Sequence, residues 1–176
     1  MKVTVVHATP HINLPLIKAS GLLFIPEKPP ISGLDIDADR VARELGLGPE
    51  HRRTGAVWAC FPNWTETIDW FVGLGLLGDL SVLTGEKTGI VAFEVDAERT
   101  YAYNFKPLWQ EEETEYAEDF DKAARAYWRS ATLLRDLVGK PEPWPGNTEI
   151  LVRGPMAPWR LRMYLSYQDF LKAEGR

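Results

Sequence analysis

Residues 147–152 read NTEILV, and residues 5–9 read VVHAT. In the first stretch Glu149 opens an aliphatic run of strand length, and in the second His7 leaves a run of β-branched residues. Short apolar runs rich in β-branched residues are typical of buried strands. The imidazole and the carboxylate can therefore meet in one cleft, although they lie near opposite ends of the chain.

The rest of the chain alternates strand patterns with helical patterns. We expect strands at Lys2–Val6, Ala56–Phe61, Gly89–Val95, Thr100–Phe105, Thr148–Arg153 and Leu161–Tyr164. We expect helices at Asn13–Ala19 with a stop at Gly21, at Asp37–Leu45 with Asp37 as cap, and at Thr114–Val138 as one long amphipathic helix. Strands interrupted by helices without a regular βαβ rhythm predict an α+β fold. Because no repeat or linker interrupts residues 1–176, we expect a single domain.

The composition is that of an ordinary globular protein. Hydrophobic residues make up 45% and charged residues 26% of the 176 residues. No apolar run approaches the roughly 20 residues that cross a bilayer, and the first residues lack the pattern of a signal peptide. The single cysteine, Cys60, excludes an intramolecular disulfide and a cysteine-rich zinc site. We therefore expect a cytoplasmic protein with no membrane association.

The charge and the aromatic content leave the kind of partner open. A net charge of −5 argues against non-specific coating of nucleic acid. The seven tryptophans are either core and rim residues or, in part, the walls of a groove where a flat ligand stacks. The acidic run at residues 111–121 is either a solvated helix face, a cation site or a mimic of nucleic acid.

Common nucleotide and nucleophile motifs are absent from the sequence. There is no Gly-x-Gly-x-x-Gly before a helix, no phosphate-binding Gly-x4-Gly-Lys-Ser/Thr and no Gly-x-Ser-x-Gly turn. His7 and His11 have the spacing of a helical zinc pair, but Pro10 lies between them and no glutamate follows His7. No metal site is predicted.

Three segments together resemble the ADP-ribosyltransferases, in the branch that includes poly(ADP-ribose) polymerases and diphtheria toxin. That branch places a histidine in a His-x-Thr context at the end of its first strand, which His7 and Thr9 match. Trp58 after Gly55, with Trp70 further on, resembles the central aromatic pair, although the usual residues of that pair are tyrosines. Glu149 matches the glutamate that opens a later strand.

The two ends of the chain resemble more closely the DNA-modifying ADP-ribosyltransferase toxins of toxin–antitoxin pairs. The pattern His7-x-Thr9-x3-Asn13-Leu14-Pro15 carries this likeness at the start, and Glu149-Ile150-Leu151-Val152-x-Gly154-Pro155 carries it at the end. Such toxins have a central arginine that contacts the cofactor. Arg52 and Arg53 are both candidates for it.

The resemblance implies a fold, a substrate and a site. The fold would be an ADP-ribosyltransferase-like split, mixed β-sheet core with flanking helices. The substrate would be NAD+, without a metal, and its ADP-ribose would pass to a nucleic acid or a protein. A ring nitrogen of His7 would donate to a ribose hydroxyl beside Thr9, Trp58 and Trp70 would stack on nicotinamide, and Glu149 would be the catalytic residue.

Two other functions remain open at this point. One is an NAD+-dependent RNA 2′-phosphotransferase on the same fold, which would need several phosphate-binding arginines. The other is a non-catalytic protein that keeps the scaffold and acts through a partner surface made by the tryptophans and the acidic helix. A toxin of the resembling kind would also have an antitoxin or inhibitor as its partner.

Overall fold

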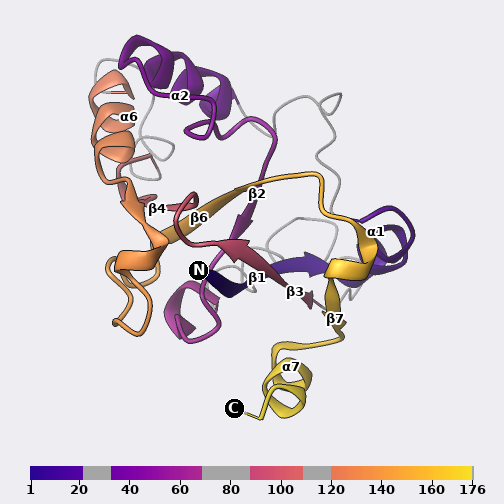
Figure 1. Cartoon of the computed structure of the whole chain (residues 1–176). Coiled ribbons are helices and arrows are strands. Elements are labelled where there is room, and N and C mark those ends of the chain that lie inside the picture. The colour runs from indigo at the N-terminus through magenta and orange to yellow at the C-terminus, as the bar shows by residue number, and fades with distance from the viewer. Residues whose placement is uncertain (22–32, 69–87, 109–119, 176) are drawn as a thin grey trace.

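The computed structural model describes residues 1–21, 33–68, 88–108 and 120–175 (Figure 1). The strands are β1 (Lys2–Pro10), β2 (Ala56–Ala59), β3 (Thr88–Asp96), β4 (Tyr101–Asn104), β5 (Thr132–Leu133), β6 (Thr148–Arg153) and β7 (Arg162–Tyr164). The helices are α1 (Leu14–Ser20), α2 (Gly33–Glu44), α6 (Phe120–Arg129) and α7 (Tyr167–Ala173). Three short 3-10 turns are η1 (His11–Asn13), η2 (Leu134–Asp136) and η3 (Pro158–Arg160).

The strands form two antiparallel sheets that touch at one point. One sheet has the order β1-β3-β7 and the other the order β2-β6-β4-β5. Val6 and Cys60 join them, because the amide of each donates to the carbonyl of the other at 2.9 and 3.0 Å. The α+β class is therefore confirmed. The expectation of a mixed sheet is not met, since every strand pair in the described ranges is antiparallel.

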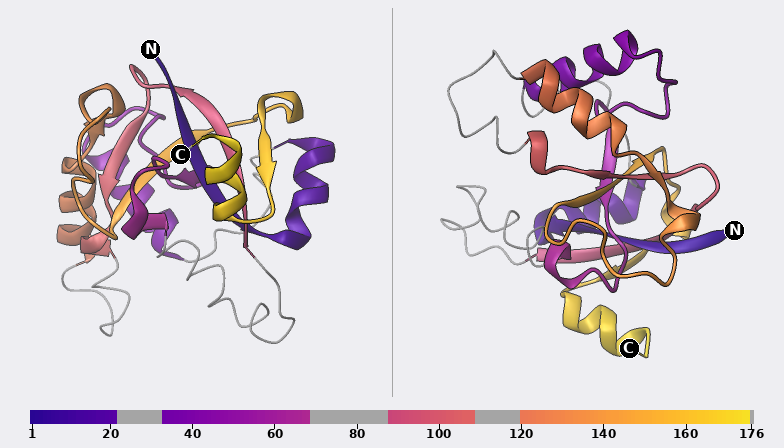
Figure 2. Two further views of the ribbon diagram at one scale, coloured as in Figure 1. Left: turned by 90° about the horizontal axis from the view of Figure 1, so that it is seen from below. Right: turned by 90° about the vertical axis from the view of Figure 1, so that its left-hand side faces the viewer.

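Strand β6 is buried on both faces and divides two hydrophobic cores. Ile150 and Val152 belong to a core shared with β1 and β3, whereas Leu151 belongs to a second core beneath α2 and α6. Alternate residues of a strand point to opposite faces, so an uninterrupted apolar run fits this position. Helices α2 and α6 pack together at one end of the molecule, and α7 lies at the other end (Figures 1 and 2).

Helix α2 begins earlier than its sequence pattern indicates. It starts at Gly33 rather than at Asp37, so the prediction of Asp37 as cap is wrong. The cause is a tertiary one: Asp35 and Asp39, one turn apart, both accept hydrogen bonds from Arg53, which holds the extra first turn in helical form. The carboxylate that was expected to cap the helix, that of Asp37, lies within it instead, 4.0 Å from Nε of Arg40 one turn on.

The single long helix expected from Thr114 to Val138 is also wrong. Helix α6 ends at Arg129, and the residues before Phe120 lie outside the described ranges. Ser130 terminates it, because its hydroxyl donates to the carbonyl of Tyr127 at 2.6 Å and accepts from the amide of Asn104 at 2.8 Å. The next residues then pair with β4 as the edge strand β5.

Gly21 ends α1 at a place where a side chain has no room. Its φ is +83°, and a Cβ there would lie 1.9 Å from the carbonyl oxygen of Met156. We expect Gly21→Ala to lower the free energy of unfolding by about 1–3 kcal/mol, measured by urea denaturation. Gly139→Ala is the matched control, because its φ is +73° but nothing lies within 4 Å of its added Cβ. Equal losses in the two variants would mean that the contact with Met156 contributes nothing.

Within the described ranges, no helix combines the length and the apolar character that a bilayer crossing demands.

Candidate active site

Glu149 is buried at the start of β6, and its two carboxylate oxygens have different surroundings. Its side chain is 3% exposed. Oε1 accepts short hydrogen bonds from Nη1 of Arg53 and from the hydroxyl of Tyr127. No described residue donates to Oε2. Among the described residues, one oxygen is therefore held by the protein, and the other has no donor.

Arg53 holds this carboxylate and is itself held at two places. Its Nε donates to Oδ1 of Asp35 at 2.7 Å, and its backbone amide donates to Oδ1 of Asp39 at 2.6 Å. The guanidinium is almost completely buried, and Nη2 donates to none of the described side chains. The neighbouring Arg52 has a different role, because its guanidinium donates to backbone carbonyls, including that of His51 at 2.6 Å. Of the two candidate arginines, Arg53 is the one that enters the site.

Three aromatic rings surround the Arg53 guanidinium. Its central carbon lies 5.3 Å from the ring centroid of Trp58, 4.9 Å from that of Phe105 and 5.2 Å from that of Tyr127. Aromatic faces attract a cation and exclude water from it. This arrangement fixes the charge of Arg53 in a low-dielectric environment, where its interaction with Glu149 is strong.

The electrostatics of the cluster leave it with an excess of acid. Burial raises the pKa of Glu149, and the charge of Arg53 opposes that shift. Burial lowers the pKa of Arg53, but the nearby acids raise it by more, so the guanidinium stays charged. Burial and the charge of Glu149 raise the pKa of Tyr127, which therefore keeps its proton as a donor. With Asp35 also buried beside Arg53, the cluster holds two carboxyl groups against one guanidinium and suits a cationic ligand.

His7 lies on β1, next to β2, and one of its ring nitrogens can act as an acceptor. Its Nδ1 lies 2.7 Å from the carbonyl oxygen of Trp58 and must donate to it. Burial lowers the pKa of His7, with the Trp58 bond opposing, so the ring is neutral at pH 7 and Nε2 carries a lone pair. The expected donor is thus engaged, and the ring offers an acceptor instead. Thr9, two residues along β1, is buried and its hydroxyl accepts from Nδ2 of Asn13 at 3.0 Å.

A chain of contacts connects His7 with Glu149. His7 bonds the backbone of Trp58, the ring of Trp58 lies against Arg53, and Arg53 bonds Glu149. The structure therefore brings together three of the residues singled out in the sequence, around an arginine. Trp70 lies outside the described residues.

Sequence reasoning missed two members of this cluster and left a third undecided. Tyr127 was assigned only to a helix face, Asp35 was not considered, and Arg53 was one of two candidates. The available signal was weak: two aspartates one helical turn apart, followed by an arginine just before a strand. Such a pattern occurs on many solvated helices.

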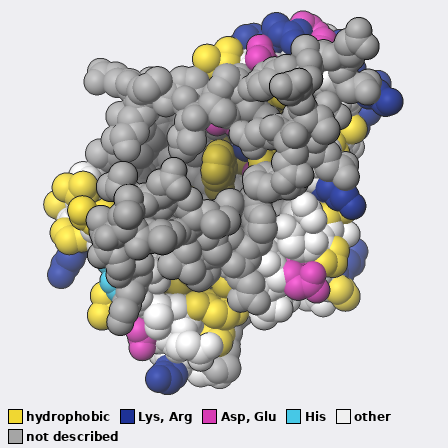
Figure 3. Space-filling view, turned by 180° about the vertical axis from the view of Figure 1, so that it is seen from behind, with side chains coloured by type: hydrophobic (Ala, Val, Ile, Leu, Met, Phe, Trp, Pro, Cys, Tyr) yellow, Lys and Arg dark blue, Asp and Glu magenta, His cyan; other side chains and the backbone are white. Residues whose placement is uncertain are grey.

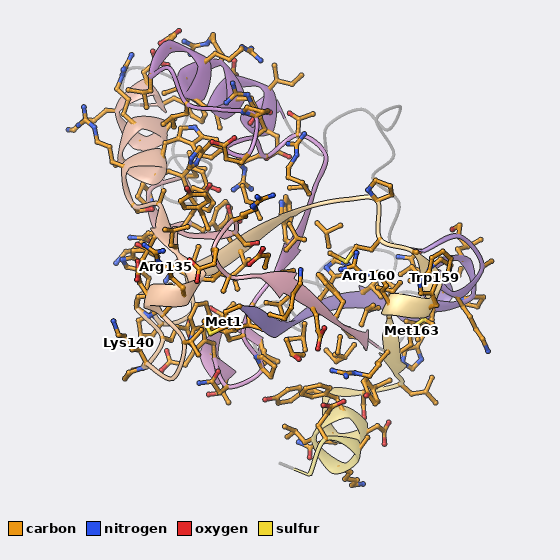
Figure 4. All side chains as sticks on the ribbon, viewed as in Figure 1. Met1, Arg135, Lys140, Trp159, Arg160 and Met163 are labelled. Carbon is orange, nitrogen blue, oxygen red and sulfur yellow. The ribbon has the colours of Figure 1, made fainter. Side chains whose placement is uncertain are left out.

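The described tryptophans divide between core and surface. Trp64 and Trp128 are buried, and Nε1 of Trp128 donates to the carbonyl of Ala38 at 2.7 Å. Trp159 on η3 is 85% exposed and lies beside α1 (Figure 4). Other exposed hydrophobic side chains of the same region are Ile12, Leu16 and Leu165. Hydrophobic side chains gather at this edge of the molecule, on the left of Figure 3.

Two histidines, the buried His51 and the half-buried His7, make the stability depend on pH. Burial lowers the pKa of His7 and also that of His51, whose Nδ1 shares a 2.8 Å hydrogen bond with the hydroxyl of Tyr103. The unfolded chain binds protons on both rings near the ordinary value of 6.5, whereas the folded chain does so only at lower pH. Their contribution to stability is therefore complete above that value and is lost as the pH falls below it.

We expect urea unfolding to require less denaturant at about pH 5.5 than at about pH 8, with a flatter profile for His51→Gln. The difference between the pH profiles of wild type and His51→Gln reports the contribution of His51 alone. Glu149 is present in both proteins, and its raised pKa changes stability with pH in the opposite sense. Parallel profiles for wild type and His51→Gln would contradict this assignment.

Comparison with family models, with curated proteins and with solved structures gives no match to this chain. Across the described ranges, no group of three or more His, Cys, Asp or Glu side chains is arranged to hold a metal ion.

Proposed function

We propose that the protein is a mono-ADP-ribosyltransferase that cleaves NAD+ and transfers ADP-ribose to a macromolecule, either a nucleic acid or a protein. The observation that carries the proposal is the buried carboxylate of Glu149, held through Oε1 by Arg53 and connected through Trp58 to His7. The two sheets, joined only at Val6 and Cys60 among the described strands, support an ADP-ribosyltransferase-like split core.

The polar atoms of the site for which the described residues supply no partner would match groups of NAD+. Oε2 of Glu149 would accept from the 2′-hydroxyl of the nicotinamide ribose, and Nε2 of His7 would accept from a hydroxyl of the adenosine ribose. Nη2 of Arg53 would donate to an oxygen of the dinucleotide. Trp58 would provide the aromatic wall beside nicotinamide. Trp70 stays in the proposal as a second wall, on the resemblance alone.

The reaction would proceed through charge separation that this site favours. The bond between C1′ of ribose and N1 of nicotinamide breaks, and its electron pair leaves with nicotinamide as a neutral ring. The positive charge that remains on C1′ and the ring oxygen resembles that of glycoside cleavage. Glu149, in a cluster with excess acid, would stabilise this charge. The acceptor then forms a bond to C1′, and its proton passes to the carboxylate or to solvent.

The test is the release of free nicotinamide from NAD+ by the purified protein, followed by chromatography. We expect release without added metal, and a higher melting temperature when NAD+ is present because ligands stabilise the state that binds them. A folded protein that neither releases nicotinamide nor responds to NAD+ would contradict the proposal.

A second candidate is a non-catalytic protein that acts through a partner surface. The observation in its favour is the exposed cluster of Trp159, Ile12, Leu16 and Leu165, since contiguous exposed hydrophobic residues often mark interaction sites. This candidate would account for a folded protein that is inert toward NAD+.

A further inference from the structure

Asp35 contacts the side chain of Arg53 but lies on a different element from the rest of the cluster. It belongs to the first turn of α2 and is buried. Its Oδ1 accepts from Nε of Arg53 at 2.7 Å. Asp35 therefore binds a different nitrogen of the guanidinium from Nη1, which donates to Glu149.

Two aspartates on one helix face determine where Arg53 can lie. Asp39 accepts from the backbone amides of Arg53 and Thr54 at 2.6 and 3.1 Å, which fixes the start of this residue. Asp35 fixes the guanidinium end of the Arg53 side chain. A guanidinium is planar, so an acceptor held at Nε also sets the direction of Nη1 and Nη2. With both aspartates in place, Nη1 points at Oε1 of Glu149 and at the hydroxyl of Tyr127.

We infer that Asp35 is a positioning residue for the proposed reaction: by binding Nε of Arg53 from α2, it directs the guanidinium toward Glu149 and sets the charge balance around that carboxylate. The inference rests on the proposed function of the site. It assigns to α2 a role in catalysis, although no residue of α2 would touch the reacting atoms.

The experiment compares three variants with wild type by kcat and KM for nicotinamide release across a range of pH. Asp35→Ala removes the acceptor from Nε, and we expect kcat to fall on the order of 100-fold, as a small misplacement of a catalytic group does. Asp35→Asn keeps an acceptor oxygen but removes the charge, and we expect a smaller loss. Asp37→Asn is the matched control, because this side chain is on the same helix but 51% exposed. We expect it to behave as wild type.

The pH profile separates positioning from a purely structural role. The negative charge of Asp35 is one of the causes that raise the pKa of Glu149, after burial. Because Glu149 must be ionised to act, the acid limb of the kcat profile should move to lower pH in Asp35→Asn. The loss of a merely structural contact would leave that limb in place.

The outcomes distinguish this inference from the function on which it rests. A wild type that releases no nicotinamide overturns both. An active wild type whose acid limb is unchanged in Asp35→Asn, and whose kcat is unchanged in Asp35→Ala, overturns the role of Asp35 alone. If Asp35→Ala does not fold, Asp35→Asn decides the question by its acid limb.

Discussion

Arg53→Ala should lower the free energy of unfolding by about 3–5 kcal/mol, the cost of removing one partner from a buried ion pair. The substitution leaves Asp35 and Glu149 buried without the guanidinium that bonds both. It also removes the cation between the rings of Trp58 and Tyr127. The free energy of unfolding would be measured by urea denaturation near pH 7, and the loss should shrink at low pH, where the unpaired carboxyl of Glu149 takes up a proton.

Arg40→Ala is the matched control for this prediction. Arg40 makes ion pairs of similar length, at 2.6 Å to Glu44 and 2.5 Å to Asp121, but at the surface. Water competes for exposed pairs and salt screens them, so we expect a much smaller change. Similar losses for Arg40→Ala and Arg53→Ala would show that burial does not govern the strength of the Arg53 cluster.

The central strands were predictable because their signal is local, whereas the edge strand β5 lies where a helix was expected. The strand at residues 148–153 was expected at the bounds that the structure gives to β6, and the expected strand at Gly89–Val95 differs from β3 by one residue at each end. Both are central strands, β6 between β2 and β4 and β3 between β1 and β7. A central strand buried on both faces must be apolar at nearly every position, and that pattern is read within a single short stretch.

The stop of α1 at Gly21 was predicted correctly, but the start of α2 and the end of α6 were not predictable, because tertiary contacts set them. Helix α6 stops at Arg129 since Ser130 bonds the amide of Asn104 on a strand far away in the chain. Helix α2 gains a turn because Asp35 meets Arg53. Neither partner leaves a mark on the local pattern: the helical pattern runs past the end of α6, and in α2 it begins only inside the helix.

In the candidate site, too, some residues were predictable from a local pattern and others were not. His7 and Glu149 stand out in the sequence because each lies beside an apolar run of strand length. Arg53 and Tyr127 do not, because nothing in their own segments indicates that both will bond one carboxylate oxygen. The role of the His7 ring also depended on the structure: the carbonyl of Trp58 fixes which nitrogen holds the proton.

Glu149→Gln should reduce kcat for nicotinamide release by about 1,000-fold, within the range that a positioned acid–base group contributes. The amide has nearly the shape of the carboxylate, and its oxygen can still accept from Arg53 and Tyr127. The fold should therefore survive. What is lost is the negative charge beside the developing oxocarbenium ion and the group that can take a proton from the acceptor.

The readout that isolates this charge is kcat at saturating NAD+, with the melting temperature as a check on the fold. Glu94→Gln on β3 is the control, since it makes the same chemical change at an exposed position away from the cluster, and it should keep wild-type kcat. Wild-type activity should also rise with pH along its acid limb, because burial raises the pKa of Glu149 and only the ionised form stabilises the cation. A folded Glu149→Gln protein that releases nicotinamide as fast as wild type would remove Glu149 from the reaction.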